Sequence, residues 1–347
     1  MSDPLLGLLL KKVSRSFFLS LQILPPPLKE PMGLAYLLAR AADTLADLPA
    51  VSLPSRLTAL DHFRLRLQGE NRRLFEYLEE GCRTTDAACG EIILLHNLSD
   101  CFRRYDALGD SDREKVSRLL MTLTHGMITD LTVFHEENRQ LVVALKTRRD
   151  LESYTYSVAG CVGEFWTEML MAHCPSCSHW NLETMTQKGV RFGQGLQMTN
   201  ILRDLSHDLR LGRCYLPASD LAALGLQPEE LLNPVAMNRL RPLLRDLLSV
   251  TLDFYGEGWD YLQAIPRLEP RLRLACCWPL FIGLKTIERL ARSDNFLDPA
   301  VPVKISRRAV YGLLAKTSLL IFSRYGLGLY YHNLVSQIEK HIQYQLW

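Results

Sequence analysis

The chain has 347 residues, of which 48% are hydrophobic and 22% are charged, so it has the composition of a globular protein with material for a large core. Its formal net charge of +2 is too small to indicate nucleic-acid binding. The nine cysteines show no disulfide-like framework, which favours a reducing compartment and free, mostly buried thiols.

The sequence carries no evident secretory signal or membrane span. Residues 4–10 are apolar, but Asp3 precedes them and Lys11 and Lys12 follow, which is the reverse of the order in a signal peptide. No run reaches the ~20 apolar residues that a spanning helix needs. We therefore expect a chain that is soluble or at most peripheral to a membrane.

Leucine-rich segments with helical spacing recur from end to end, whereas alternating strand patterns are scarce. Glycine and proline cluster between these segments, and no linker is long enough to separate domains. We therefore predict one all-helical domain over residues 1–347.

The first polar motif in chain order is Ser14-Arg15-Ser16-Phe17. A planar guanidinium with a hydroxyl donor on either side matches phosphate oxygens. Such a tripeptide also serves as a helix cap, and both interpretations stay open.

A helix predicted over residues 33–47 carries Tyr36, Arg40, Asp43 and Asp47 about one turn apart on one face. Most of its other positions are leucine or alanine, which pack in a core. Two like charges one turn apart cost roughly 0.2–0.5 kcal/mol. A sequence keeps such a pair when a cation lies between the two carboxylates, or when both point to water.

Residues 154–165 combine an aromatic start with small residues in a predicted helix interior. Ala159, Gly160 and Gly163 let another group approach the backbone closely, although glycine costs roughly 1 kcal/mol relative to alanine in a helix. Helix packing is the more common reason for such a face, and a long apolar ligand is the alternative. The ring of Tyr154 can stabilise a nearby cation by ~0.5–2 kcal/mol.

The acidic pattern returns in a helix predicted over residues 197–208. Its polar stripe consists of Gln197, Asn200, Asp204 and Asp208, and its apolar anchors are Leu196, Ile201 and Leu205. Arg203 adds a cation, as Arg40 does in the earlier helix. A polar stripe on a helix with a buried face indicates a lined cavity, and a solvated face is the alternative.

Two helices with the same arginine and aspartate-pair pattern are hard to attribute to chance. Carboxylate oxygens suit Mg²⁺, which also takes waters and substrate phosphates as ligands. We therefore predict that the two clusters face each other and hold a metal-bridged diphosphate. The alternatives are two solvated faces, or Asp–Arg pairs that link helices.

Two basic stretches follow the second acidic helix. Arg210 and Arg213 come directly after it, where a phosphate leaving group could be clamped. Lys304, Arg307 and Arg308 form a small basic patch, for which an ordinary basic helix start is the alternative.

Together these motifs resemble those of the squalene/phytoene synthases, which are head-to-head prenyl transferases of the all-α isoprenoid synthase fold. The resemblance extends from Ser14 to about Arg308. It rests on residues 14–17, 36–47, 154–163 and 197–217.

The resemblance implies a central cavity between helices that binds Mg²⁺ and two prenyl diphosphates. The metal ligands that it implies are Asp43, Asp47, Asn200, Asp204 and Asp208. The substrate-binding residues that it implies are Ser14, Arg15, Ser16, Phe17, Tyr36, Gln197, Asn200 and Arg213. The catalytic residues that it implies are Arg40, Asp43, Tyr154, Arg203 and Asp204. In this scheme Tyr154 steers proton loss or shields the cation of the first half-reaction.

Within the family, three features resemble squalene synthases, which reduce presqualene diphosphate with NADPH. They are Asp43-Thr44-Leu45 before Asp47, Cys276 to Pro279 with Lys285-Thr286, and Val303-Lys304-Ile305 with its basic cluster. The resemblance thus implies a squalene synthase that condenses two farnesyl diphosphates, with Lys304, Arg307 and Arg308 binding NADPH. Ala46 and His207 depart from this pattern, because many squalene synthases carry a glutamate at these positions.

Two other functions stay open. A dehydrosqualene or phytoene synthase would perform the condensation without reduction, and a non-catalytic relative would bind a prenyl chain or assist assembly. The chain looks like a bacterial-type member without a C-terminal anchor, which implies a cytoplasmic protein that contacts the inner membrane peripherally for product release. Beyond the prenyl substrates we expect no nucleic acid and no obligate protein partner.

Overall fold

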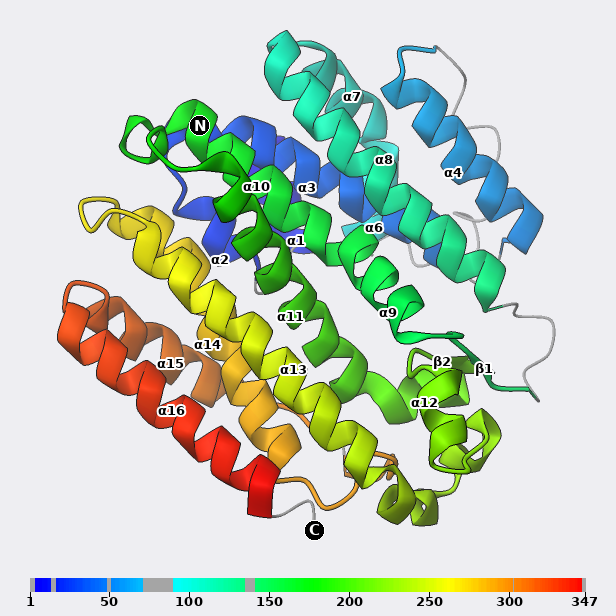
Figure 1. The fold of residues 1–347 in the computed structure, drawn as a ribbon. Helices are drawn as coiled ribbons and strands as arrows, with labels where there is room; N and C mark the ends of the chain where they lie inside the picture. The colour runs from blue at the N-terminus through cyan, green and yellow to red at the C-terminus, as the bar shows by residue number, and fades with distance from the viewer. Residues whose placement is uncertain are drawn as a thin grey trace. The chain divides into compact units, whose positions relative to one another are not determined.

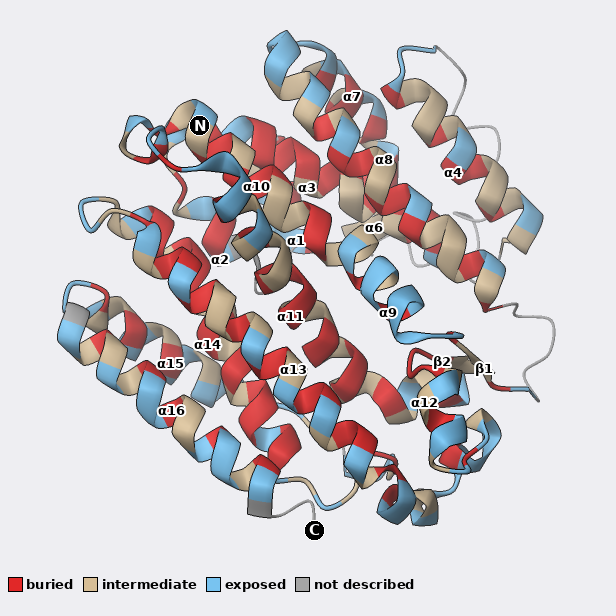
Figure 2. Cartoon of the chain, in the orientation of Figure 1, coloured by how far each residue is buried: buried red, intermediate tan, exposed pale blue. Residues whose placement is uncertain are grey.

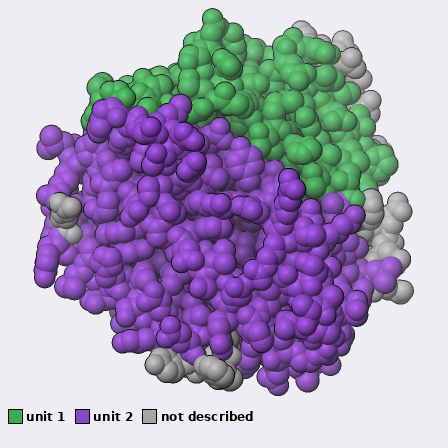
Figure 3. Space-filling view, viewed as in Figure 1, with its two compact units in different colours: residues 1–132, 165–178 green, residues 133–164, 179–347 purple. Residues whose placement is uncertain are grey.

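The computed structural model describes residues 4–13, 17–48, 51–70, 90–134, 141–301 and 303–344. These residues are mostly helical (Figure 1), which confirms the all-α prediction. The chain divides into two compact units, which Figure 3 colours separately: Met1–Thr132 with Phe165–Ser178 (unit 1), and Val133–Glu164 with His179–Trp347 (unit 2). A single domain over residues 1–347 stays a prediction.

Unit 1 is organised around the long helix α3, whose sequence explains both its start and its buried face. Two prolines occupy its first two positions, where the missing N–H groups cost no helical hydrogen bond. Leu34, Leu38 and Leu45 on its inner face are almost wholly buried. The elements of this part of the chain are a π-helical stretch Pro4–Leu9, α1 (Leu10–Val13), α2 (Phe17–Gln22), α3 (Pro26–Asp47), α4 (Leu53–Leu67), α6 (Gly90–His96), α7 (Leu98–Asp106) and α8 (Asp110–Val133).

The next part of the chain leads from unit 2 through α10 to the central helix α11. Thr147 and Asp150 form a capping box at the start of α9, and Asn181 caps α11 by accepting the Thr184 backbone N–H at 2.9 Å. The elements here are β1 (Val143–Ala144), α9 (Arg148–Thr155), a π-helical stretch Tyr156–Gly160, α10 (Cys161–His173), a 3₁₀ turn Pro175–Cys177 and α11 (Leu182–Arg210).

The rest of unit 2 packs long helices against α11, and the buried residues in Figure 2 mark their inner faces. Helix α11 contacts both α13 and α14, and α16 in turn packs on α13 and α14. The elements are β2 (Arg213–Cys214), α12 (Ala218–Ala223), 3₁₀ turns Pro228–Leu232 and Pro234–Ala236, α13 (Met237–Ala264), α14 (Pro270–Ala291), α15 (Arg307–Leu320) and α16 (Arg324–Tyr344).

The small residues before and after Gly160 serve helix packing. A Cβ atom added at Gly163 would lie 1.9 Å from the backbone oxygen of Gly189, and one added at Gly193 would lie 2.4 Å from that of Ala159. Backbone meets backbone at both places, so only glycine fits. Of the two interpretations of this face, packing against α11 is the one confirmed.

Aromatic side chains fix the directions of the helices in unit 2. The ring of Phe281 on α14 stacks on Tyr330 of α16 at 5.1 Å between centroids, and Arg292 meets His341 at 2.9 Å between Nε and Nε2. The two contacts are eleven residues apart on both helices, so α14 and α16 run in the same direction. Helix α13, joined to α14 by a short connection, runs in the opposite direction (Figure 1).

Two short strands set the backbone that follows α11. Gly212 adopts a φ of +80°, which reverses the chain after the helix. Strand β2 then pairs in parallel with β1 in the register Val143↔Arg213 and Ala144↔Cys214. Arg213 thereby has a fixed backbone position one turn beyond the acidic helix.

None of the helices in the described ranges combines the length and apolar character of a membrane span.

Candidate functional site

The first predicted cluster lies on α3 and reaches a second helix. Arg40 pairs with Asp43 through one guanidinium nitrogen, and its other terminal nitrogen, Nη2, lies 2.7 Å from Oε1 of Glu91 on α6. Arg40 therefore bridges two carboxylates. Glu91 had no place in the predicted site, because its contact joins positions 51 residues apart in the chain.

Burial and charge act together on this cluster. Partial burial is the largest influence on Asp43, and the charge of Asp47 is the second; they raise the pKa of Asp43 to about 6 against the opposing effect of Arg40. Burial works to lower the pKa of Arg40, but the carboxylates of Glu91 and Asp43 outweigh it and raise that pKa, so the guanidinium stays charged. The Nε atom of Arg40 is buried and has no hydrogen-bond partner among the described residues.

The neighbouring positions show which side of α3 is exposed. Asp47 is exposed at the end of the helix, and Tyr36 is half-buried and donates a long hydrogen bond of 3.5 Å to the backbone oxygen of Val13. Ala46, in contrast, retains only 5% of its exposed area. Because position 46 faces the core, alanine there does not remove a carboxylate from the exposed acidic face of this helix.

The second cluster lies on α11 in unit 2. Arg203 binds the carboxylate of Asp204 through two nitrogens, with Nε at 2.9 Å from Oδ1. The hydrogen bond with Asp204 is the main reason why the pKa of Arg203 is raised, with burial opposing it and Asp208 supporting it. Asn200 donates to Oε1 of Gln197 at 3.4 Å, so the predicted stripe is internally connected.

Apolar residues beside the stripe anchor α11 in the core. Ile201 and Leu205 are 2% and 1% exposed, as expected for core anchors, whereas Leu196 is half-buried. Below the stripe, Thr199 and the fully buried Tyr255 of α13 share a hydrogen bond of 2.9 Å between their hydroxyl oxygens. This buried polar pair fixes α11 against α13.

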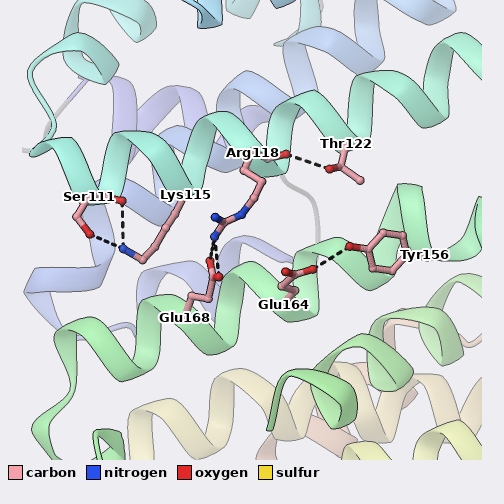
Figure 4. Close-up of polar contacts among 7 residues, drawn as sticks. All are labelled: Ser111, Lys115, Arg118, Thr122, Tyr156, Glu164 and Glu168. Carbon is pink, nitrogen blue, oxygen red and sulfur yellow. Dashed lines mark hydrogen bonds and ion pairs between the residues drawn. The ribbon is translucent and has the colours of Figure 1, made fainter. Parts of the chain in front are cut away.

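Tyr154 belongs to an aromatic cluster within unit 2. Its ring stacks on Tyr215 at 4.8 Å with an interplanar angle of 23°, and Phe134 meets the same Tyr215 ring edge-on at 5.0 Å. Tyr156, two residues later, donates instead to a carboxylate oxygen of Glu164 at 2.8 Å (Figure 4). Stacked rings of this kind offer negative π-faces and an apolar wall.

Figure 4 also shows contacts on α8 and α10 of unit 1 that belong to the helix surface. Arg118 pairs with Glu168, and Thr122 donates to the backbone oxygen of Arg118 at 3.0 Å. Nearby, Arg113 pairs with Asp110 at 2.6 Å, and the Asp110 side chain is 94% exposed. These pairs are charge contacts on the helix surface.

Several predicted residues lie outside these clusters. Ser14, Arg15 and Ser16 fall outside the described residues, and Phe17 begins α2. Arg213 is half-buried in β2. Their predicted role in substrate binding stays a prediction.

The three residues predicted to bind NADPH are exposed at the start of α15. The backbone oxygen of Lys304 accepts a hydrogen bond from Arg289 at 2.8 Å, and Ser306 caps the helix before Arg307 and Arg308. A cavity of about 670 Å³ lies nearby between α14, α15 and α16. Its charged lining consists of Lys285, Glu288, Arg289, Arg292 and Lys316, so the predicted trio is not part of it.

The structure thus shows each arginine paired with an aspartate of its own helix, Arg40 with Asp43 and Arg203 with Asp204. Within the described ranges, no three His, Cys, Asp or Glu side chains gather as a metal-binding group. Joining the Asp43 cluster to the Asp204 cluster requires residues of both units, and their meeting stays a prediction. So do the metal-ligand roles of Asp43, Asp47, Asn200, Asp204 and Asp208.

Comparisons with known proteins agree on one family. The family model described as squalene/phytoene synthase matches residues 10–309. A bifunctional lycopene cyclase/phytoene synthase of Colletotrichum graminicola is 28% identical over 260 residues, which are 74% of this chain and 41% of that protein. A phytoene synthase of Arthrospira platensis is 26% identical over 276 residues, 78% of this chain and 76% of that one. The chain therefore spans less than half of the fungal protein.

Solved structures show the same fold. The complex of TcSQS with the ligand E5700 superposes with a TM-score of 0.71 at 19% identity and covers 96% of both chains. A dehydrosqualene synthase in complex with ligand gives 0.61 at 21% identity and covers 90% of this chain and 94% of that one. At these identities the likeness is one of fold.

Proposed function

The chain belongs to the squalene/phytoene synthase family, and from this membership we propose that it is a prenyltransferase that joins two prenyl diphosphates head to head. The observation that carries the proposal is the repeated arginine–aspartate cluster. One copy is Arg40 with Asp43, and the other is Arg203 with Asp204. Two clusters suit a reaction with two diphosphates.

The first chemical step would be the departure of one diphosphate from its allylic carbon. Negative charge then grows on the leaving oxygens, and positioned cations lower the barrier by stabilising it. Arg40 and Arg203 are held charged and oriented by their carboxylate partners. The buried Nε of Arg40, which has no hydrogen-bond partner among the described residues, offers a further donor for a ligand oxygen.

The donor set also fits a divalent cation. Asp43 and Asp47 repel each other enough to contribute to the raised pKa of Asp43, and a hard cation between them would relieve that repulsion. We propose that Mg²⁺ is held by Asp43, Asp47, Asn200, Asp204 and Asp208. When bound, Mg²⁺ neutralises part of the charge that develops on the diphosphate.

The carbocation left behind must be kept from water. The stacked rings of Tyr154 and Tyr215 supply π-faces that stabilise positive charge and an apolar wall that excludes solvent. We propose that Tyr154 shields the cation, with Tyr36 and Gln197 lining the substrate path.

The final product separates two candidates. The exposed basic stretch of Lys304, Arg307 and Arg308 beside a basic cavity supports a squalene synthase that binds NADPH and reduces the intermediate. The phytoene synthase names of the relatives support the same condensation without reduction. We propose two molecules of farnesyl diphosphate as the substrates and squalene as the product, and this pairing of substrate and product is the first to test.

The experiment is a product assay with the purified full chain. It is incubated with Mg²⁺ and either farnesyl or geranylgeranyl diphosphate, with and without NADPH, and the hydrocarbons are identified by mass spectrometry. Squalene formed only with NADPH supports the first pairing. Dehydrosqualene or phytoene formed in the presence of NADPH supports condensation without reduction. No condensation product under any condition would overturn the prenyltransferase proposal.

A further inference from the structure

Large apolar side chains are exposed at one end of the unit 2 helices. They are Leu268 (93% exposed) in the connection between α13 and α14, and Leu319 (79%), Phe322 (74%) and Tyr325 (84%) at the turn between α15 and α16. We call these four residues the apolar tip. Both connections lie at the left edge of Figure 1, and exposed residues mark both in Figure 2.

The packing of α13 on α16 brings the two connections to the same height. Trp259 of α13 stacks on Tyr331 of α16 at 4.1 Å with an interplanar angle of 5°. The helices run in opposite directions, so residues after Trp259 lie level with residues before Tyr331. Leu268 is nine residues after Trp259, and Phe322 is nine residues before Tyr331. At a rise of about 1.5 Å per helical residue, they reach a similar height.

Cations outnumber acidic side chains in the sequence around the apolar tip. No aspartate or glutamate occurs between Asp298 and Glu339. Of the cations in that interval, Lys316 and Arg324 belong to the end of α15 and the start of α16, next to the tip, whereas Lys304, Arg307 and Arg308 lie at the other end of α15. The ammonium of Lys316 lies 3.8 Å from the ring centroid of Tyr330, so this charge is held on α15 against α16. On the other connection, Arg267 and Arg271 are exposed on either side of Leu268, and Glu269 lies between them, so this stretch has two cations and one carboxylate.

We propose that the apolar tip docks the protein on an anionic lipid bilayer. Leucine and aromatic side chains insert at the boundary between headgroups and acyl chains, while lysine and arginine beside them attract acidic lipid headgroups. A second copy of the chain fits less well, because a twofold contact would place the same basic surface against itself.

The proposal stands on the surface of unit 2 and not on the proposed chemistry. Vesicle binding needs no substrate, so its failure is distinguishable from a failure of the product assay. If both proposals hold, a water-insoluble hydrocarbon would be made by a protein already seated at a lipid surface.

The test is flotation of the full chain with vesicles of phosphatidylcholine alone, or of phosphatidylcholine with phosphatidylglycerol, at low and high NaCl. We expect binding to the anionic vesicles and a loss of at least about fivefold at high salt, because salt screens headgroup charges. The double variant Leu319→Ser with Phe322→Ser should bind at least about tenfold more weakly, because it removes the apolar contacts. Arg271→Glu should weaken binding to anionic vesicles specifically.

The matched control is Val235→Ser. Val235 is 75% exposed and precedes α13, at the helix end opposite to the one that leads to Leu268, so this variant should bind like the wild type. Circular dichroism and thermal unfolding check that the variants fold. A Phe322→Trp variant gives a second readout, an emission shift to the blue on vesicle addition beyond that of the wild type.

Three results would overturn the proposal. The first is no binding to anionic vesicles, and the second is unchanged binding by the Leu319→Ser, Phe322→Ser variant. The third is a dimer, seen by light scattering, that the double variant dissociates while vesicle binding is unaffected; it would assign the apolar tip to a contact between two copies.

Discussion

Glu91 connects the first arginine–aspartate cluster to another helix of unit 1. Its carboxylate holds one end of the Arg40 guanidinium, and Asp43 holds the other. A guanidinium with both ends held keeps a fixed orientation, which matters when it must meet a diphosphate oxygen in a narrow range of angles. Glu91 is therefore a positioning residue for Arg40.

Replacing Glu91 by glutamine tests this role. We expect kcat/KM of Glu91→Gln to fall about tenfold, because Arg40 loses a charged partner and part of its orientation. Glu91→Asp should recover part of the loss. The control is Glu168→Gln, which removes the partner of Arg118 on the same unit and should leave the kinetics unchanged. Equal losses in the two glutamine variants would indicate a general structural effect instead.

The buried cysteines behave as core side chains. The cysteines among the described residues are free and buried, as the sequence predicts for its thiols. Burial is the main influence in each case, and it raises the pKa of Cys101, Cys161, Cys214 and Cys277 to about 12.

This shift predicts protection from alkylation. The thiolate is the reactive form, and a thiol with a pKa near 12 is ionised to only about one part in 10⁴ at pH 8. We expect these four cysteines to stay unlabelled by iodoacetamide at pH 8 in the native protein and to be labelled in urea, as read by peptide mass spectrometry. Rapid native labelling at any of the four would contradict its burial.

Helix α11 is constrained by close packing of backbone against backbone. It meets the Tyr156–Gly160 stretch and the first turn of α10 backbone to backbone, at Gly189 and Gly193. The polar stripe begins one turn after Gly193 on the same side of the helix, because Gly189, Gly193, Gln197, Asn200 and Asp204 follow one another at spacings of three or four residues. The stripe can be held accurately only if this backbone contact is rigid.

Two glycine variants separate close packing from intrinsic helix preference. In Gly163→Ala the added Cβ would lie 1.9 Å from a backbone oxygen, so we expect the free energy of unfolding to fall by about 1–3 kcal/mol or more. In Gly256→Ala of α13 nothing lies within 4 Å of the new atom, and we expect a gain of about 0.4–1 kcal/mol. Urea denaturation measures both, and a Gly163→Ala protein as stable as the wild type would contradict the packing.

The helices were predictable from sequence where local pattern decides them. The apolar spacing of α3 and the caps of α9 and α11 are local signals, and both predicted acidic stripes fall on helices. The contact with Glu91 was not predictable, since it depends on how α6 packs on α3. Likewise, the burial of Ala46 follows from the core face of α3, whereas family comparison alone presents it as a missing carboxylate.

For the molecule as a whole, the proposed reaction needs both acidic clusters at once. Asp43 belongs to unit 1 and Asp204 to unit 2, and each is paired with the arginine of its own helix. If each cluster holds one part of a shared diphosphate and metal assembly, loss of either cluster should remove stabilisation of the same transition state. If each serves a separate ligand, their losses should be independent.

The variants Asp43→Asn and Asp204→Asn, alone and combined, distinguish these cases. We expect each single variant to lose about 10²–10³-fold in kcat, since each removes charge that stabilises the departing diphosphate. The double variant should lose clearly less than the product of the two, because groups that act on one transition state are not additive. Asp110→Asn is the control, because its side chain is 94% exposed in a surface pair with Arg113 and should keep full activity. Losses that multiply, or a single variant with wild-type activity, would mean that the two clusters do not act on one transition state.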